Sequence, residues 1–141
     1  MKKIPPEDIQ KILKVSYDGL GEIEQEIFLD IACFFQGWPK NDVADILNAC
    51  ELNPDFGIPR LVKKCLITVT QGGSLSMHDL IQQMGREVVR QESRQMPGER
   101  SRIWSYEDGY KVLIGNTVYV LFLQIFLFFF FYQVEIMDFS F

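Results

Sequence analysis

The sequence predicts a mainly α-helical, winged-helix fold, in which a helix-turn-helix is followed by a small β-hairpin wing. Three observations support this fold class. Apolar residues recur at helical spacing between residues 9 and 65, and β-branched and alternating residues follow between 66 and 77. Helical spacing then returns from residue 80.

The first two helices are predicted to end around Asp18 and to span residues 22–35. The first has an apolar face formed by Ile9, Ile12, Leu13 and Tyr17. The second begins with acids, which the helix dipole favours there, and is apolar almost all round from residue 27. We expect its core motif to be buried, with the acid facing solvent or a helix end; the motif is Phe28, Leu29, Asp30, Ile31, Ala32, Cys33, Phe34 and Phe35.

Two further helices are predicted on either side of a turn at residues 53–55. Each has apolar residues at i, i+3, i+4 and i+7, which indicates one buried face. These residues are Val43, Ile46, Leu47 and Cys50 in the first and Ile58, Leu61, Val62 and Cys65 in the second. Asn41 or Asp42 is suited to cap the first.

The wing is predicted as a hairpin with strands at residues 66–70 and 75–77, joined by a glycine-containing turn. A helix from about residue 80 to Glu92 follows, and then a loop at residues 93–102. We expect this loop to be solvated, in preference to the alternative that Arg100 and Arg102 form an anion site. Ser105 and Asp108 resemble a capping box that opens a short helix ending near Leu113.

The composition excludes several classes of function. The net charge of −5 argues against sequence-independent nucleic-acid binding. In a winged helix the candidate recognition helix for DNA is residues 57–65, and it offers only Arg60, Lys63 and Lys64. The three cysteines lie on apolar helical patterns, so we expect reduced core residues and no disulfide. No catalytic or metal-binding residues are expected, and residues 1–6 contain no apolar stretch typical of a signal peptide.

The C-terminal residues 118–141 differ from the rest in composition. They contain 8 of the 12 phenylalanines and no lysine or arginine. Residues 118–134 are almost wholly apolar, yet a membrane-spanning helix needs about 20 such residues. We favour the hypothesis that these residues are a read-through extension from an intron. A membrane anchor formed by residues 118–134 is the alternative.

The only histidine, His78, lies where the second strand gives way to a helix. Backbone N–H groups at a helix start have no intrahelical partner and favour an anion. His78 and Asp79 therefore suit either of two roles: they cap the helix, or they contact a ligand phosphate.

Five motifs in this order allow a family to be recognised: Ile12–Leu20, Glu26–Phe35, Met77–Ile81, Met84–Ser93 and Pro97–Trp104. Together they closely resemble the C-terminal part of the nucleotide-binding (NB-ARC) module of plant disease-resistance receptors. The subclass is the one with an N-terminal TIR domain and C-terminal leucine-rich repeats. The resemblance implies the end of the preceding helical subdomain at residues 1–20, the winged-helix subdomain with its following helix at 21–117, and the Phe-rich extension at 118–141.

The resemblance also implies a role in switching. In the family this subdomain closes over ADP, and the switch motif maps onto Met77, His78 and Asp79. His78 would contact the β-phosphate of ADP, and Asp79 would hold the closed arrangement. The implied cofactors are ADP and ATP in the intact receptor, the implied partners are its nucleotide-binding and repeat domains, and the implied location is the cytoplasm or nucleus.

The chain departs from the intact receptor because it has no phosphate loop, no Mg²⁺-binding acids, no TIR domain and no repeats. We therefore expect no enzyme activity, and negligible ADP binding by the isolated chain. The alternative function is a free-standing winged-helix interaction module that binds no nucleotide, tethered to a membrane if the tail inserts.

Overall fold

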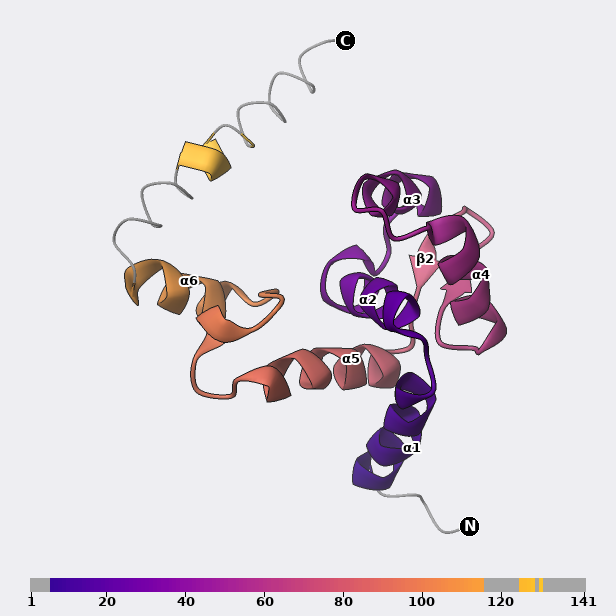
Figure 1. Ribbon diagram of the computed structural model, residues 1–141, viewed down its shortest axis with the longest axis horizontal. Helices are drawn as coiled ribbons and strands as arrows, with labels where there is room; N and C mark the ends of the chain where they lie inside the picture. The colour runs from indigo at the N-terminus through magenta and orange to yellow at the C-terminus, as the bar shows by residue number, and fades with distance from the viewer. Residues whose placement is uncertain (1–5, 116–124, 129, 131–141) are drawn as a thin grey trace. The chain divides into compact units, whose positions relative to one another are not determined.

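The computed structural model describes residues 6–115, 125–128 and 130, and the chain divides into two units, residues 1–94 and 95–141 (Figure 1). The first unit contains α1 (Pro6–Asp18), α2 (Glu22–Asp30), η1 (Ile31–Phe35), α3 (Lys40–Ala49), α4 (Pro54–Lys63), β1 (Thr68–Val69), β2 (Leu75–Ser76) and α5 (Asp79–Glu92). The second contains η2 (Pro97–Glu99) and α6 (Tyr106–Gly115). The predicted mainly α winged-helix fold is confirmed.

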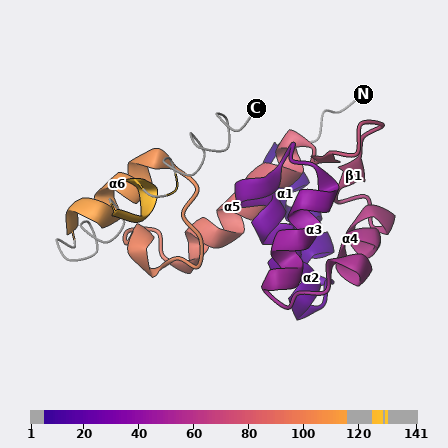
Figure 2. The same cartoon turned by 90° about the horizontal axis from the view of Figure 1, so that it is seen from above.

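The core of the first unit is built around α2 and η1. α2 contacts both α4 and α5, η1 packs on α5, and α3 lies beside α4 (Figures 1 and 2). Ile27, Phe28 and Ile31 have no solvent exposure. Because α2 is apolar on nearly every side, it can form the centre that the other helices cover.

The wing is a two-stranded antiparallel sheet in which Thr68 lies opposite Ser76. A third segment joins the other edge of β2, since the Gly37 N–H donates to the Leu75 carbonyl at 2.8 Å and the Leu75 N–H to the Trp38 carbonyl at 2.9 Å. The strands are shorter than predicted, because only two residues on each side complete the ladder. The pairing of Gly37 and Trp38 with the wing was not predicted.

The predicted second helix is not a continuous α-helix. It changes at Ile31 into a turn of π-helix that ends at Phe35. The wider π turn alters which side chains point inward, and Phe34 is 41% exposed. The expectation that the whole motif is buried is therefore wrong for Phe34, and Phe35 is only half-buried. The other apolar residues of the motif are buried: Phe28, Leu29, Ile31, Ala32 and Cys33.

Two cysteines also depart from expectation. Cys33 is buried, whereas Cys50 and Cys65 are exposed. Cys50 follows the last residue of α3, and Cys65 lies beyond α4 with a left-handed φ of 59°. The helical repeat therefore stops before either residue reaches the core, and the prediction of core cysteines is wrong for both. The predicted buried faces are also wrong at Ile46 and Val62, which are exposed within their helices.

The fourth helix begins earlier than predicted. Asn53 adopts a left-handed conformation and Pro54 is the first residue of α4. Proline suits a first helical position, because its fixed φ is helical and it has no N–H to leave unpaired. The predicted turn at 53–55 is thus mostly the start of the helix.

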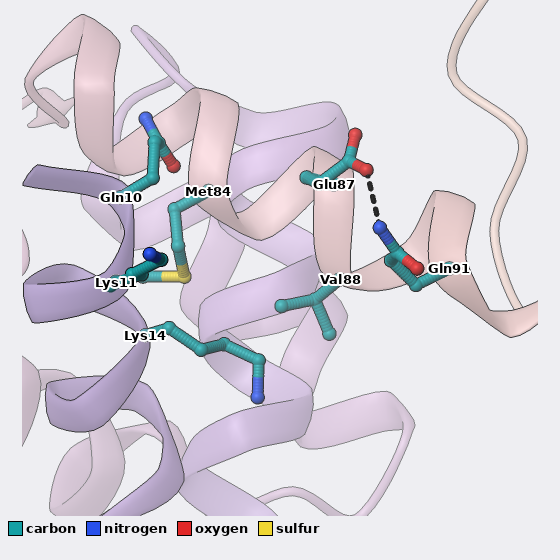
Figure 3. A pocket seen from close by; sticks show the side chains of 7 residues that line it. All are labelled: Gln10, Lys11, Lys14, Met84, Glu87, Val88 and Gln91. Atoms are coloured by element: carbon teal, nitrogen blue, oxygen red, sulfur yellow. Dashed lines mark hydrogen bonds between the residues drawn. The ribbon is translucent and has the colours of Figure 1, made fainter. Parts of the chain in front are cut away.

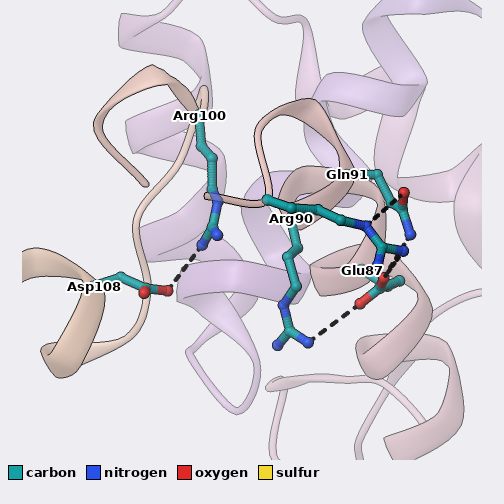
Figure 4. Close-up of polar contacts among 6 residues, drawn as sticks. Glu87, Arg90, Gln91, Arg100 and Asp108 are labelled. Carbon is teal, nitrogen blue, oxygen red and sulfur yellow. Dashed lines mark hydrogen bonds and ion pairs between the residues drawn. The ribbon is translucent and has the colours of Figure 1, made fainter. Parts of the chain in front are cut away.

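The second unit is organised by buried arginines. The Arg100 side chain is 5% exposed and binds Asp108 at 2.9 Å (Figure 4), and Arg102 is also buried. Ser105 Oγ accepts the Asp108 N–H at 3.2 Å, as the capping box predicts. The expectation that the loop at residues 93–102 is solvated is therefore wrong at Arg100, because its side chain is buried against the carboxylate of Asp108.

The described part of the chain contains no helix long and apolar enough to cross a membrane. Most of residues 118–141 lie outside the described residues, so the read-through and membrane-anchor interpretations stay predictions. The predicted domain limits at residues 20 and 117 stay predictions as well.

Candidate functional site

The switch motif occupies the junction between β2 and α5. Met77 is 3% exposed and anchors the junction in the core, whereas His78 and Asp79 are exposed. The buried methionine holds the backbone at the point where the strand ends, and the next two side chains point to solvent at the start of α5. His78 and Asp79 are therefore exposed at a junction whose backbone is anchored by the buried Met77.

His78 is the N-cap of α5. Its backbone is extended, and its Nδ1 accepts the backbone N–H of Leu80 at 3.1 Å. A ring nitrogen that accepts a hydrogen bond carries no proton, so the neutral imidazole holds its proton on Nε2. The capping interpretation is thus correct for one nitrogen, and the other nitrogen is a hydrogen-bond donor at an exposed helix start.

Capping and phosphate binding are therefore compatible roles for His78. The cap uses Nδ1, and no hydrogen bond within the described residues uses Nε2. An anion at this position would meet the Nε2–H donor and the positive end of the α5 dipole. The residues present fit a phosphate oxygen, with the ring as a neutral donor.

Asp79 is the first residue of α5. A carboxylate there stabilises the helix dipole by about 0.3–1 kcal/mol. Its side chain makes no hydrogen bond or ion pair with the described residues. The contact by which Asp79 would hold a closed arrangement, as the resemblance implies, is therefore not made to the described part of this chain.

Two glutamines fix the first turns of α5. The Gln10 Nε2 of α1 donates to the Leu80 carbonyl at 3.1 Å, and the Gln82 Nε2 donates to the Ala32 carbonyl of η1 at 3.2 Å. Both bonds are partly buried and join residues 50 or more positions apart. They tie the switch junction to α1 and to the core, and periodicity could not have revealed them.

A hollow of about 320 Å³ lies between α1 and α5 (Figure 3). Met84 and Val88 of α5 face the stems of Lys11 and Lys14 of α1 across it, and the lining is mainly apolar. On its α5 side, Gln91 donates to Glu87 at 2.7 Å. The two helices are therefore incompletely packed along this stretch.

Glu87 also belongs to a polar network on α5. It lies 3.4 Å from Arg90 (Figure 4). It also lies 3.7 Å from Arg94, just beyond the end of α5, and Arg94 donates to Gln91 at 3.3 Å. These side chains are largely exposed, so each pair contributes little to stability. We therefore interpret these contacts as ordinary interactions between solvent-exposed side chains.

The predicted recognition helix, α4, is joined to α2 by an ion pair in which the carboxylate is buried and the guanidinium is about half exposed. Arg60 Nε binds Glu24 Oε1 of α2 at 2.6 Å, and the Arg60 guanidinium lies over the Phe56 ring at 5.1 Å. The Glu24 side chain is 8% exposed. Arg60 is thus used to join α4 to α2, which leaves Lys63 and Lys64 as the remaining basic residues of the predicted recognition helix.

Metal chemistry finds no support in the described residues, where no group of three His, Cys, Asp or Glu side chains could hold a metal ion. The site instead offers one N–H donor and the positive end of the α5 dipole, with the exposed Asp79 carboxylate beside them. The donor and the dipole favour an anion.

The helices α2 to α4, the wing and the following α5 define a winged-helix domain with an anion-suited junction at His78. A family profile described as "Disease resistance protein Roq1-like, winged-helix domain" matches residues 21–93. The chain belongs to this family of plant disease resistance proteins, and the family predicted from the five motifs is confirmed.

Three individual relatives are likewise resistance proteins of plants. Disease resistance protein RUN1 of Vitis rotundifolia is 49% identical over 104 residues, which cover 74% of this chain and 8% of that protein. TMV resistance protein N of Nicotiana glutinosa is 42% identical over 105 residues, 74% of this chain and 9% of that protein. Disease resistance protein RPV1 of Vitis rotundifolia is 48% identical over 112 residues, 79% of this chain and 8% of that protein. The chain thus spans less than a tenth of the length of these curated relatives.

Proposed function

We propose that this chain is the regulatory winged-helix subdomain of a plant immune receptor. In the intact receptor it closes over bound ADP and controls the exchange of ADP for ATP in defence signalling. Its partners are the nucleotide-binding and leucine-rich-repeat domains of that receptor, its location is the cytoplasm or nucleus, and it has no catalytic activity of its own.

One observation carries this proposal: His78 caps α5 through Nδ1 and so directs an Nε2–H donor outward from the helix start. The β-phosphate of ADP is a suitable acceptor. A ligand shifts a conformational equilibrium only by binding one state better than the other. A donor supplied by this subdomain makes ADP favour the closed state, because that contact exists only when the subdomain lies over the nucleotide.

Asp79 is the residue with which to test switching. In an intact receptor carrying this segment, Asp79→Val should loosen the closed state, lower the amount of ADP that co-purifies with the receptor, and raise effector-independent cell death. A conservative Asp79→Asn variant is the matched control for side-chain size. If Asp79→Val gives a silent receptor of normal abundance with normal ADP content, the role assigned to the motif is wrong.

The isolated chain should bind ADP negligibly. A single hydrogen bond from Nε2–H to a charged phosphate contributes about 1.5–3 kcal/mol, which is far below the roughly 8 kcal/mol needed for micromolar affinity. The rest of the site must come from elsewhere in the receptor. Isothermal calorimetry of the 141-residue chain with ADP tests this, and a micromolar dissociation constant would contradict it.

A further inference from the structure

Leu80, the second residue of α5, is bound at both ends of its backbone by side chains. Its N–H donates to His78 Nδ1 at 3.1 Å, and its carbonyl accepts the Gln10 amide at 3.1 Å. An α-helical carbonyl also accepts the N–H four residues on, and its second lone pair is available for Gln10. One residue of the helix thus connects His78 to α1.

The attachment of α1 to the first unit is uneven along its length. Tyr17, near its C-terminal end, is buried and packs against Phe28 with ring centroids 5.5 Å apart. Between Lys11 and Lys14 the hollow separates α1 from α5 (Figure 3). Gln10 also lines the hollow, and its bond to Leu80 attaches the N-terminal half of α1 to the first turn of α5.

We propose that Gln10 is a positioning residue for His78. By holding the Leu80 carbonyl, Gln10 keeps the first turn of α5 wound, so that the Leu80 N–H stays directed at Nδ1 and the ring keeps its orientation. A movement of α1 away from α5 breaks this bond and loosens the cap. α1 thereby controls the direction of the Nε2–H donor, and the consequence for nucleotide rests on the proposed function.

The first test uses nuclear magnetic resonance on the full chain. His78 is the only histidine, so its ring nitrogens are assigned without ambiguity. The scalar coupling between the Leu80 backbone nitrogen and His78 Nδ1 reports the cap directly, and the Leu80 amide exchange rate reports its opening.

Gln10→Met keeps a long unbranched side chain and removes the donor. We expect it to weaken the coupling and to raise Leu80 amide exchange about two- to tenfold, the effect of one net hydrogen bond. Lys11→Met, at the next residue of α1, is the matched control and should match the wild type. Gln10→Lys restores a donor and should restore both signals.

Two results would overturn the proposal: wild-type coupling and exchange in Gln10→Met, or failure of Gln10→Lys to recover them. The nucleotide consequence is measured separately, as the ADP dissociation rate of the intact receptor. We expect faster ADP release from Gln10→Met than from Lys11→Met. If Gln10→Met releases ADP at the wild-type rate while His78→Asn releases it faster, Gln10 does not act through His78. If neither Gln10→Met nor His78→Asn changes ADP release, although coupling and exchange show a weaker cap in Gln10→Met, the proposed function is wrong. The link between Gln10 and the cap is then still supported.

Discussion

Replacing Gly85 by alanine tests how closely α5 approaches the core. A Cβ at this position would lie 2.7 Å from Ala32 Cβ and 3.1 Å from Phe28 Cε1. Ordinary van der Waals contact begins at 3.4 Å, so the first distance is short by about 0.7 Å. The Cβ of Ala32 belongs to a buried residue and cannot rotate away, which means that α5 or η1 must shift.

The magnitude follows from two opposing effects. Overpacking of this kind costs about 1–3 kcal/mol, and alanine is favoured over glycine in a helix by about 0.5–1 kcal/mol. We therefore expect Gly85→Ala to lower the free energy of unfolding by about 1–2 kcal/mol, measured as faster exchange of the most protected amides of α5.

Gly109→Ala is the matched control. Gly109 lies in α6, and its added Cβ would meet Ile103 Cγ2 at an ordinary 3.8 Å. This variant should leave α5 unchanged and slow amide exchange in α6, because only the gain in helix propensity applies. If Gly85→Ala is as stable as the wild type, or more stable, α5 does not approach η1 as closely as described.

Two pairs of substitutions test single contacts by urea unfolding. His78→Ala should cost about 1 kcal/mol and His78→Asn only a few tenths, because asparagine also accepts the Leu80 N–H; equal losses would contradict the cap. Arg60→Ala leaves the buried Glu24 carboxylate without its cation. Because Arg60 is 48% exposed, we expect a cost of about 2 kcal/mol, which is below the roughly 3–5 kcal/mol of a fully buried pair. Glu24→Gln removes the buried negative charge together with the ion pair, so it should cost less than Arg60→Ala, which leaves that charge unpaired. The reverse order would refute the account of this pair.

Local patterns were sufficient for much of the fold. The change from helical to alternating spacing located the wing, because the two periods reflect which face of each element is buried. Five motifs in fixed order then identified the family. The end of β2 and the start of α5 were also predictable, and with them the place of His78.

The features that were missed depend on long-range geometry. Gln10 and Leu80 are 70 positions apart, and a single polar residue on a half-buried helix face carries no signal of its partner. The same holds for Glu24 and Arg60. The burial of Cys50 and Cys65 was predicted wrongly, because helical spacing was extended past the ends of α3 and α4, where the chain leaves the helix.

The site illustrates a further limit. From the sequence, capping and phosphate binding were competing roles for His78. The structure gives Nδ1 to the cap and leaves Nε2 as a donor, so the two roles concern different atoms. Which nitrogen does what is a property of ring orientation, and ring orientation is not encoded in residue spacing.

The central claim is therefore that His78 donates its Nε2–H to ADP, while its Nδ1 accepts the Leu80 N–H and caps α5. The measurement that tests it most directly is the ADP dissociation constant of the intact receptor carrying His78→Asn, which keeps an acceptor for the Leu80 N–H but whose shorter amide group places no donor where Nε2–H lies. Loss of one hydrogen bond to a charged phosphate, about 1.5–3 kcal/mol, predicts affinity about ten- to a hundredfold weaker with unchanged thermal stability. Wild-type ADP affinity in this variant would contradict the claim.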